Sequence, residues 1–215
     1  PGKNKKKKEK GVWGMKKILF VSLLMLLSVS VFAQYGFGKA DVGKGFIGIS
    51  FGPSIPLGDL ADNSNTNPKA GFAKAGMNLS LIQYGYRLND SYGIAGNWLG
   101  IACPFDVGGN EGVWGIGALM VGPMKSFRIN NNLLLDIKGL FGFTTVTYEY
   151  NDYDIEEESD MGLGYDLGAN LRLNLSPNFV LTASGDYFST EGKFENWDQP
   201  VDLLNFSVGL AYRLK

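Results

Sequence analysis

The feature that most constrains this chain is a strict alternation of apolar and polar residues between Leu163 and Leu175. Every odd position there carries Leu, Tyr or Ala, and every even position carries Gly, Asp, Asn or Arg. A β-strand places alternate side chains on opposite faces, so the pattern predicts an amphipathic strand. Segments 133–145, 179–187 and 204–214 repeat it. The C-terminal half is therefore expected to form a sheet with one apolar and one polar face.

The connections between strands indicate how these strands are joined. Short polar clusters at 89–91, 130–132 and 176–178 predict tight turns, whereas longer polar stretches lie at 55–71, 104–112, 149–160 and 191–200. Alternating short turns and longer loops are typical of outer-membrane barrels. The strand candidates between them are 44–54, 73–88, 92–102, 113–129, 133–148, 161–175, 179–190 and 201–214. Alternation breaks after Leu81 and around Gly122-Pro123, where we expect β-bulges or a rim position.

The N-terminal region has the features of an export signal. Met15-Lys16-Lys17 precedes fifteen uncharged residues, Ile18 to Phe32, and a small residue, Ala33. We interpret 15–33 as a signal peptide because the apolar run is shorter than the roughly 20 residues of a membrane-spanning helix, which is the alternative. The lysine-rich residues 1–14 are interpreted as an upstream extension outside the native mature protein. Residues 34–43 would form a short lead-in, and 44–215 the barrel.

Composition excludes several functions. Eight of the 20 Lys and Arg residues and one of the 21 acidic residues precede residue 34, so the mature chain has 12 basic and 20 acidic residues. That balance disfavours nucleic acid as a partner. The chain contains no histidine, which excludes histidine metal sites and Ser-His-Asp catalysis, and Cys103 is its single cysteine, so no internal disulfide forms.

Periodicity alone does not decide which face of the barrel points inward. A water-facing surface usually carries more Lys and Glu than these polar faces, which are rich in Gly, Ser, Asn and Thr. We therefore expect a membrane barrel with polar residues inside. Aromatic residues near the short turns would form an interfacial girdle: Tyr84, Tyr86, Tyr92, Phe127, Phe179 and Tyr212.

Three segments carry a resemblance to a known family. They are Gly45 to Pro53 with the following Pro56 to Asp59, the segment Val121-Gly122-Pro123, and the C-terminal Ser207 to Leu214. The chain resembles the small eight-stranded bacterial outer membrane β-barrel proteins, similar in architecture to the OmpA membrane domain and OmpX. The resemblance implies an all-β, eight-stranded antiparallel up-and-down transmembrane β-barrel in the bacterial outer membrane.

The resemblance also implies a partner. The C-terminal strand is similar to the sorting signal read by the barrel assembly machinery, with Ser207, Gly209, Tyr212 and Leu214 at the matching positions. Many such proteins end on an aromatic residue, whereas this chain ends Leu214-Lys215. We expect recognition by that machinery, a surrounding of outer-membrane lipid, and a monomer.

Three motifs have a functional and a structural interpretation. Gly38 to Lys44 has phosphate-loop spacing, but Gly45 replaces the required Ser or Thr, so a flexible lead-in is favoured. The acidic stretch Asp152 to Asp160 fails the EF-hand pattern and is interpreted as a solvated loop, with divalent cation binding left open. Six charged residues are expected to point into the interior, where they could form a buried network, line a narrow conduit or supply a catalytic pair. They are Asp136, Lys138, Asp166, Arg172, Asp186 and Arg213.

The sequence therefore predicts an integral outer-membrane barrel with a packed polar interior and a structural or surface-interaction role. It identifies no catalytic, cofactor-binding or metal-binding residue and predicts no cofactor and no enzymatic activity. The alternatives are a small porin or narrow channel, and a soluble periplasmic lipid-binding barrel. No loop holds a motif that names a ligand.

Overall fold

The computed structural model describes residues 43–150 and 155–214. The predicted signal peptide at 15–33, the extension before it and nearly all of the lead-in lie outside the described residues and remain predictions. The described elements are β1 (Gly45–Leu57), α2 (Gly58–Ala61), β2 (Gly76–Arg87), β3 (Tyr92–Val107), β4 (Asn110–Arg128), β5 (Leu133–Tyr150), β6 (Ile155–Glu158), β7 (Gly162–Asn174), β8 (Phe179–Lys193) and β9 (Asp198–Leu214).

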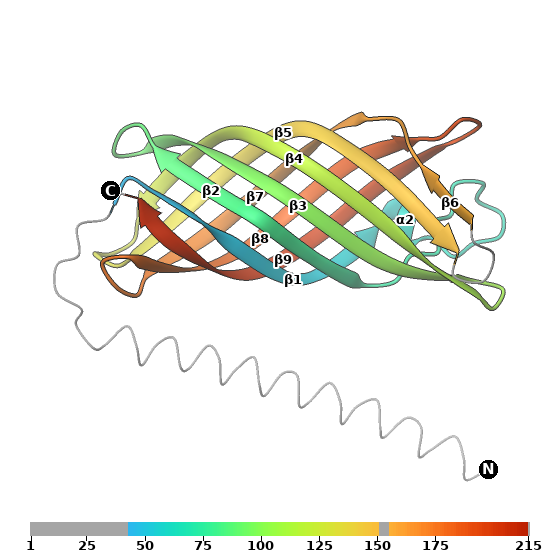
Figure 1. Ribbon diagram of the computed structural model, residues 1–215, viewed down its shortest axis with the longest axis horizontal. Helices are drawn as coiled ribbons and strands as arrows, with labels where there is room; N and C mark the ends of the chain where they lie inside the picture. Colours follow the sequence, from blue (N-terminus) through green and yellow to red (C-terminus); the bar gives the residue numbers. More distant parts are fainter. Residues whose placement is uncertain (1–42, 151–154, 215) are drawn as a thin grey trace, which may run out of the picture. The chain divides into compact units, whose positions relative to one another are not determined.

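Eight of the nine described strands close into an antiparallel barrel (Figure 1). Each ring strand pairs with its neighbours in sequence, and β1 closes the ring on β9 with Gly45 opposite Leu214. The predicted turns at 89–91, 130–132 and 176–178 connect β2 to β3, β4 to β5 and β7 to β8. The eight-stranded up-and-down topology is thus confirmed. Among the described residues, no helix has the length and apolarity needed to cross a membrane.

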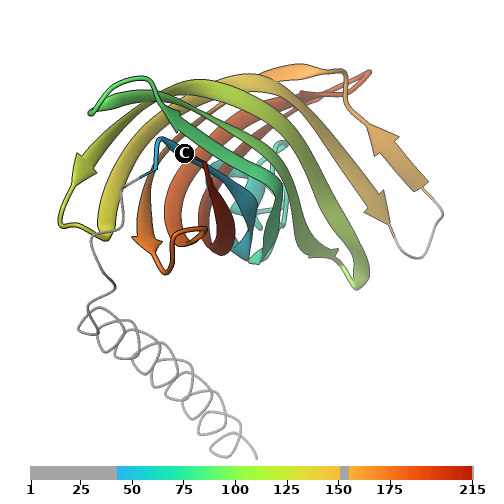
Figure 2. The same ribbon diagram turned by 60° about the vertical axis from the view of Figure 1, so that its left-hand side comes forward.

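The end opposite the short turns, here called the loop side, differs from the sequence prediction. The stretch 104–112 is not a loop, because β3 continues to Val107 and β4 starts at Asn110. Gly108 and Gly109 both have positive φ, of 63° and 95°, which a two-residue hairpin turn requires. The acidic stretch also contains β6, which lies antiparallel beside the end of β5 and outside the ring (Figure 2).

The direction of the two faces is decided in the structure. Large apolar side chains of the ring strands point outward and are about half exposed, whereas the opposite positions are buried inside. A soluble lipid-binding barrel would need the reverse arrangement, so the outward faces are those of a membrane barrel. The apolar outer positions include Ile49, Phe51, Leu79, Trp98, Val121, Phe141, Leu163 and Phe206.

One of the two predicted irregularities is present. The register of β2 against β3 shifts between Ser80 and Ile82, as expected after Leu81. At Gly122-Pro123 the pairing continues without a shift, so the bulge predicted there is wrong. The interior face of this part of β4 carries Ala118 and Met120, so both faces are apolar and the contrast between them disappears.

The interior has two parts, whereas the sequence predicted a polar interior throughout. Toward the short turns the buried residues are mainly Ser, Thr, Asn, Asp, Lys and Arg. Toward the loop side a hydrophobic core fills the barrel, and Leu60 of α2 is fully buried in it. Figure 1 shows α2 and its loop at that end of the barrel. The core residues include Ile101, Cys103, Phe105, Trp114, Phe188, Val201 and Leu203.

Candidate functional site: the barrel interior and its loop-side mouth

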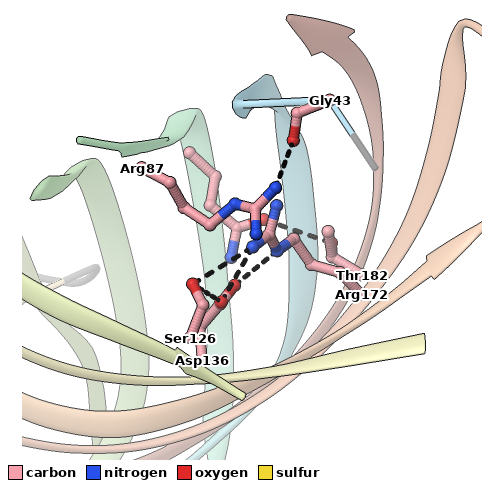
Figure 3. Close-up of polar contacts among 7 residues, drawn as sticks. Gly43, Arg87, Ser126, Asp136, Arg172 and Thr182 are labelled. Carbon is pink, nitrogen blue, oxygen red and sulfur yellow. Dashed lines mark hydrogen bonds and ion pairs between the residues drawn. The ribbon is translucent and has the colours of Figure 1, made fainter. Parts of the chain in front are cut away.

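A buried ion pair lies on the interior wall near the short turns, between the neighbouring strands β5 and β7 (Figure 3). Arg172 of β7 donates through Nη2 to Asp136 Oδ1 of β5 over 2.8 Å, and the Ser126 hydroxyl of β4 donates to the same oxygen over 2.6 Å. The Arg172 guanidinium also lies 4.9 Å from the ring centroid of Phe46. Arg87, at the end of β2, donates to the Gly43 carbonyl over 3.1 Å. The ion pair thus joins neighbouring strands, whereas the contact of Arg172 with Phe46 of β1 spans the lumen.

A second ion pair lies further along the interior. Lys138 Nζ of β5 is 3.0 Å from Asp186 Oδ1 of β8, and both side chains are buried. Gly168 of β7 lies between them in the register, opposite both residues. A Cβ on Gly168 would come within 1.8 Å of Asp186 Oδ1, so only glycine lets the aspartate reach the lysine.

Neutral polar side chains fill further parts of the interior. The Ser54 hydroxyl donates to Asn205 Oδ1 over 2.5 Å, and Asn78 Nδ2 donates to Ser54 over 3.3 Å. Across the lumen, the Thr182 hydroxyl of β8 donates to Gln83 Oε1 of β2 over 3.1 Å. These bonds satisfy polar groups that would otherwise be costly to bury.

At the loop side the aromatic core opens into a hollow of about 300 Å³. We call this hollow the mouth pocket. Pro68, Ala70 and Gly71 of the loop after α2 line one side, together with Gln199. The other lining is mainly aromatic and comes from that loop, from β3, β4 and β5, and from the turn between β8 and β9: Phe72, Phe105, Trp114, Tyr148, Tyr150 and Trp197.

Hydrogen bonds hold the loop wall of the mouth pocket in place. Trp114 Nε1 donates to the Gly71 carbonyl over 2.8 Å, and Gln199 Nε2 donates to the Lys69 carbonyl over 3.2 Å. Asn67 Nδ2 donates to Asp59 Oδ1 and to Asp62 Oδ2, over 3.0 and 2.8 Å. The bond from Asn67 lowers the pKa of the Asp62 carboxyl, because it favours the ionised form. The pocket wall is therefore ordered without a ligand.

Comparison with known proteins identifies the family. The model of the "Outer membrane protein beta-barrel domain" family matches residues 19–213. The chain belongs to this outer membrane β-barrel family. A search of curated protein sequences found no match.

Solved structures share the fold of this outer membrane barrel. Neisserial surface protein A is 13% identical with a TM-score of 0.60, and covers 79% of this chain and 97% of its own. Ail, the attachment invasion locus protein of Yersinia pestis, in complex with the heparin analogue sucrose octasulfate, is 24% identical with a TM-score of 0.50. That match covers 81% of this chain and 100% of Ail. The prediction of a bacterial outer-membrane location is confirmed.

The outer membrane barrel places all six predicted interior charges inside. Asp136, Lys138, Asp166, Arg172, Asp186 and Arg213 are buried. Sequence reasoning missed Arg87, because the bulge in β2 reverses the phase of the strand that carries it. It also missed the mouth pocket, whose aromatic residues come from three strands, the loop after α2 and the turn between β8 and β9. The two clusters of Asp136 and Asp186 do not meet in one catalytic pair, because each carboxylate has its own cation.

The two remaining sequence motifs lie partly outside the described residues. Of the segment Gly38 to Lys44, only Gly43 and Lys44 are described, and they lead into β1. Asp152 and Asp154 of the acidic stretch lie outside the described residues. In the described part of the chain, no group of three or more acidic or cysteine side chains is arranged to hold a metal ion. Cation binding by the acidic stretch remains a hypothesis.

Proposed function

We propose that this outer membrane barrel is a non-conducting protein that acts through its loop-side surface. The observation that carries the proposal is the blocked interior. Two buried ion pairs fill the polar part, the Phe46–Arg172 contact and the Gln83–Thr182 hydrogen bond span it, and an apolar core with α2 fills the loop-side part. Eight strands enclose an interior just wide enough for side chains to fill.

Planar bilayer recordings test whether the barrel conducts. We expect the refolded protein to give no steady single-channel openings, under conditions in which a general porin gives them. Steady openings that disappear in Arg172→Ala or Asp166→Asn would contradict the proposal and favour the small-porin alternative. Heat-modifiable migration on gels checks that each sample is folded before recording.

The charge of the loop side suggests what kind of surface the barrel presents. Among the described residues near that end, Lys69, Lys74 and Lys193 are the basic ones. The acidic residues there are four times as many: Asp59, Asp62, Asp106, Glu111, Glu149, Glu157, Glu158, Asp160, Glu191, Glu195, Asp198 and Asp202. Ail was crystallised with a polyanionic heparin analogue. An acidic surface repels polyanions, so we propose cationic or neutral partners instead.

The barrel assembly machinery is proposed as the partner that inserts the protein. Tyr212 points outward on β9 beside Phe179, with ring centroids 6.3 Å apart, so the sorting-signal residue faces lipid in the finished barrel. We expect Tyr212→Ala to reduce the outer-membrane level of the protein several-fold. Phe206→Ala, also outward on β9 but outside the signal, is the control. Equal losses in the two variants would indicate a general stability effect and contradict the partner.

A catalytic role is not proposed. The chain contains no histidine, and Asp136 and Asp186 are held in ion pairs with Arg172 and Lys138. We propose that the barrel acts as a monomer, because its outward faces are apolar and suited to contact with lipid.

A further inference from the structure

The mouth pocket has a ring arrangement suited to a cation. Centroids of Trp114, Tyr148 and Trp197 are 5.5 to 6.1 Å apart, and the three planes are inclined to one another by 47° to 73°. A flat aromatic ligand would need a slot between parallel rings. Three inclined faces around one hollow instead form a corner, which suits a compact group that contacts several ring faces at once.

Trp197 is held in position by its neighbours. Phe194 stacks on Trp197 at a centroid distance of 4.4 Å and an angle of 13°, so one face of the indole is covered. Trp197 also lines the mouth pocket. The contact with Phe194 fixes the orientation of Trp197 at the hairpin between β8 and β9.

The charges around the mouth pocket favour a positive ligand. Glu157 of β6 is the partner of Tyr148 in the strand register, and burial together with this carboxylate raises the pKa of the Tyr148 hydroxyl. Glu149 and Asp198 lie beside Tyr148 and Trp197 in the sequence. Lys69 lies between the lining residues Pro68 and Ala70, so three carboxylates and one Lys neighbour the pocket, and no Lys or Arg is itself among the described lining residues. A cation therefore gains from both the ring faces and the surrounding carboxylates.

We propose that the mouth pocket binds a quaternary ammonium group, such as the trimethylammonium end of choline. The hollow of about 300 Å³ is at the small end of ligand sites, which suits a headgroup better than a large solute. Because the pocket opens on the side of the long connections, the ligand would arrive from outside the cell. The inference goes beyond the proposed function and does not depend on whether the barrel conducts.

Titration with choline chloride tests the chemistry directly. The full, folded protein is studied by isothermal titration in maltoside micelles, because many other detergents carry quaternary ammonium headgroups themselves. The neutral isostere 3,3-dimethylbutan-1-ol has the same shape without the charge. We expect choline to bind at least about fivefold more tightly than the isostere. Equal affinities, or no choline binding, would overturn the proposal.

Variants locate the site. Trp197→Leu should weaken choline binding about tenfold or more, and Glu157→Gln should weaken it less and reduce its dependence on salt. Trp98→Leu, on the lipid-facing wall, should leave binding unchanged, and heat-modifiability shows that all three variants fold. Equal weakening by Trp98→Leu would place binding outside the pocket and overturn the proposal. Once choline binding is established, a separate titration with a short-chain phosphatidylcholine distinguishes the source of the group. Tighter binding of the phospholipid indicates a lipid headgroup, tighter binding of choline indicates a free solute, and both results support the proposal.

Discussion

Replacing Asp136 by alanine is expected to lower the free energy of unfolding by about 3–5 kcal/mol. Asp136 and Arg172 are 1% and 4% exposed at their side chains, so the variant leaves a guanidinium buried without its counter-ion. The Ser126 hydroxyl also loses its acceptor. Chemical denaturation of the protein refolded into lipid vesicles measures the change.

A surface pair provides the matched control for Asp136. Lys74 Nζ lies 3.3 Å from Asp106 Oδ2, but these side chains are 61% and 37% exposed. Asp106→Ala should therefore cost no more than about 1 kcal/mol. The double variant Asp136→Leu with Arg172→Leu should recover part of the loss, because it removes both charges. A loss below about 1 kcal/mol for Asp136→Ala would show that water reaches this part of the interior.

The second large effect is expected on the outer wall. Val121 of β4 points outward and is 55% exposed, between Gly96 of β3 and Phe141 of β5. It lies six residues before Phe127, which belongs to the aromatic girdle near the short turns. This spacing places Val121 near the middle of the apolar band. Val121→Arg is therefore expected to cost about 2–4 kcal/mol.

The control for Val121 is the same substitution at the membrane edge. Ile129 follows β4 at the turn to β5 and is 55% exposed as well, so Ile129→Arg should cost only about 0–1 kcal/mol. Unfolding from vesicles measures both variants. In water an exposed valine can be changed to arginine at little cost. A negligible cost for Val121→Arg would therefore contradict the placement of this wall in lipid.

Local sequence determined the strands themselves. In Leu163 to Leu175 one face is apolar and the other polar, so the alternation alone gives a strand that matches β7 within one residue at each end. The turns at 89–91, 130–132 and 176–178 were equally predictable, because Asn, Asp and Ser side chains accept hydrogen bonds from nearby backbone N–H groups, as those of Asn89, Asn130 and Ser176 do. The bulge after Leu81 was also predictable, because an extra residue reverses the alternation of apolar and polar positions.

Sequence reasoning failed where both faces of a strand have the same character. Ala118 and Met120 point inward and Leu119 and Val121 outward, so β4 carries no contrast that could exclude a bulge at Gly122-Pro123. The apolar part of the interior was missed because these strands carry apolar residues on both faces. The hairpin at Gly108-Gly109 was also read as a longer loop, because polarity hid the continuation of β3 and β4.

The sequence by itself therefore determined the number of ring strands, their short turns and which residues share a face, because these depend on neighbours along the chain. Tertiary structure decided which face points to lipid and which points into the barrel. The register of β5, β7 and β8 brought Asp136 to Arg172 and Lys138 to Asp186. Closure of β1 on β9 turned the apolar faces outward and brought Phe46 to Arg172 and Gln83 to Thr182 across the lumen. It also gathered Trp114, Tyr148 and Trp197 at one mouth. Residues that meet across a barrel are far apart in sequence, so their contact depends on register and closure, which no local pattern encodes.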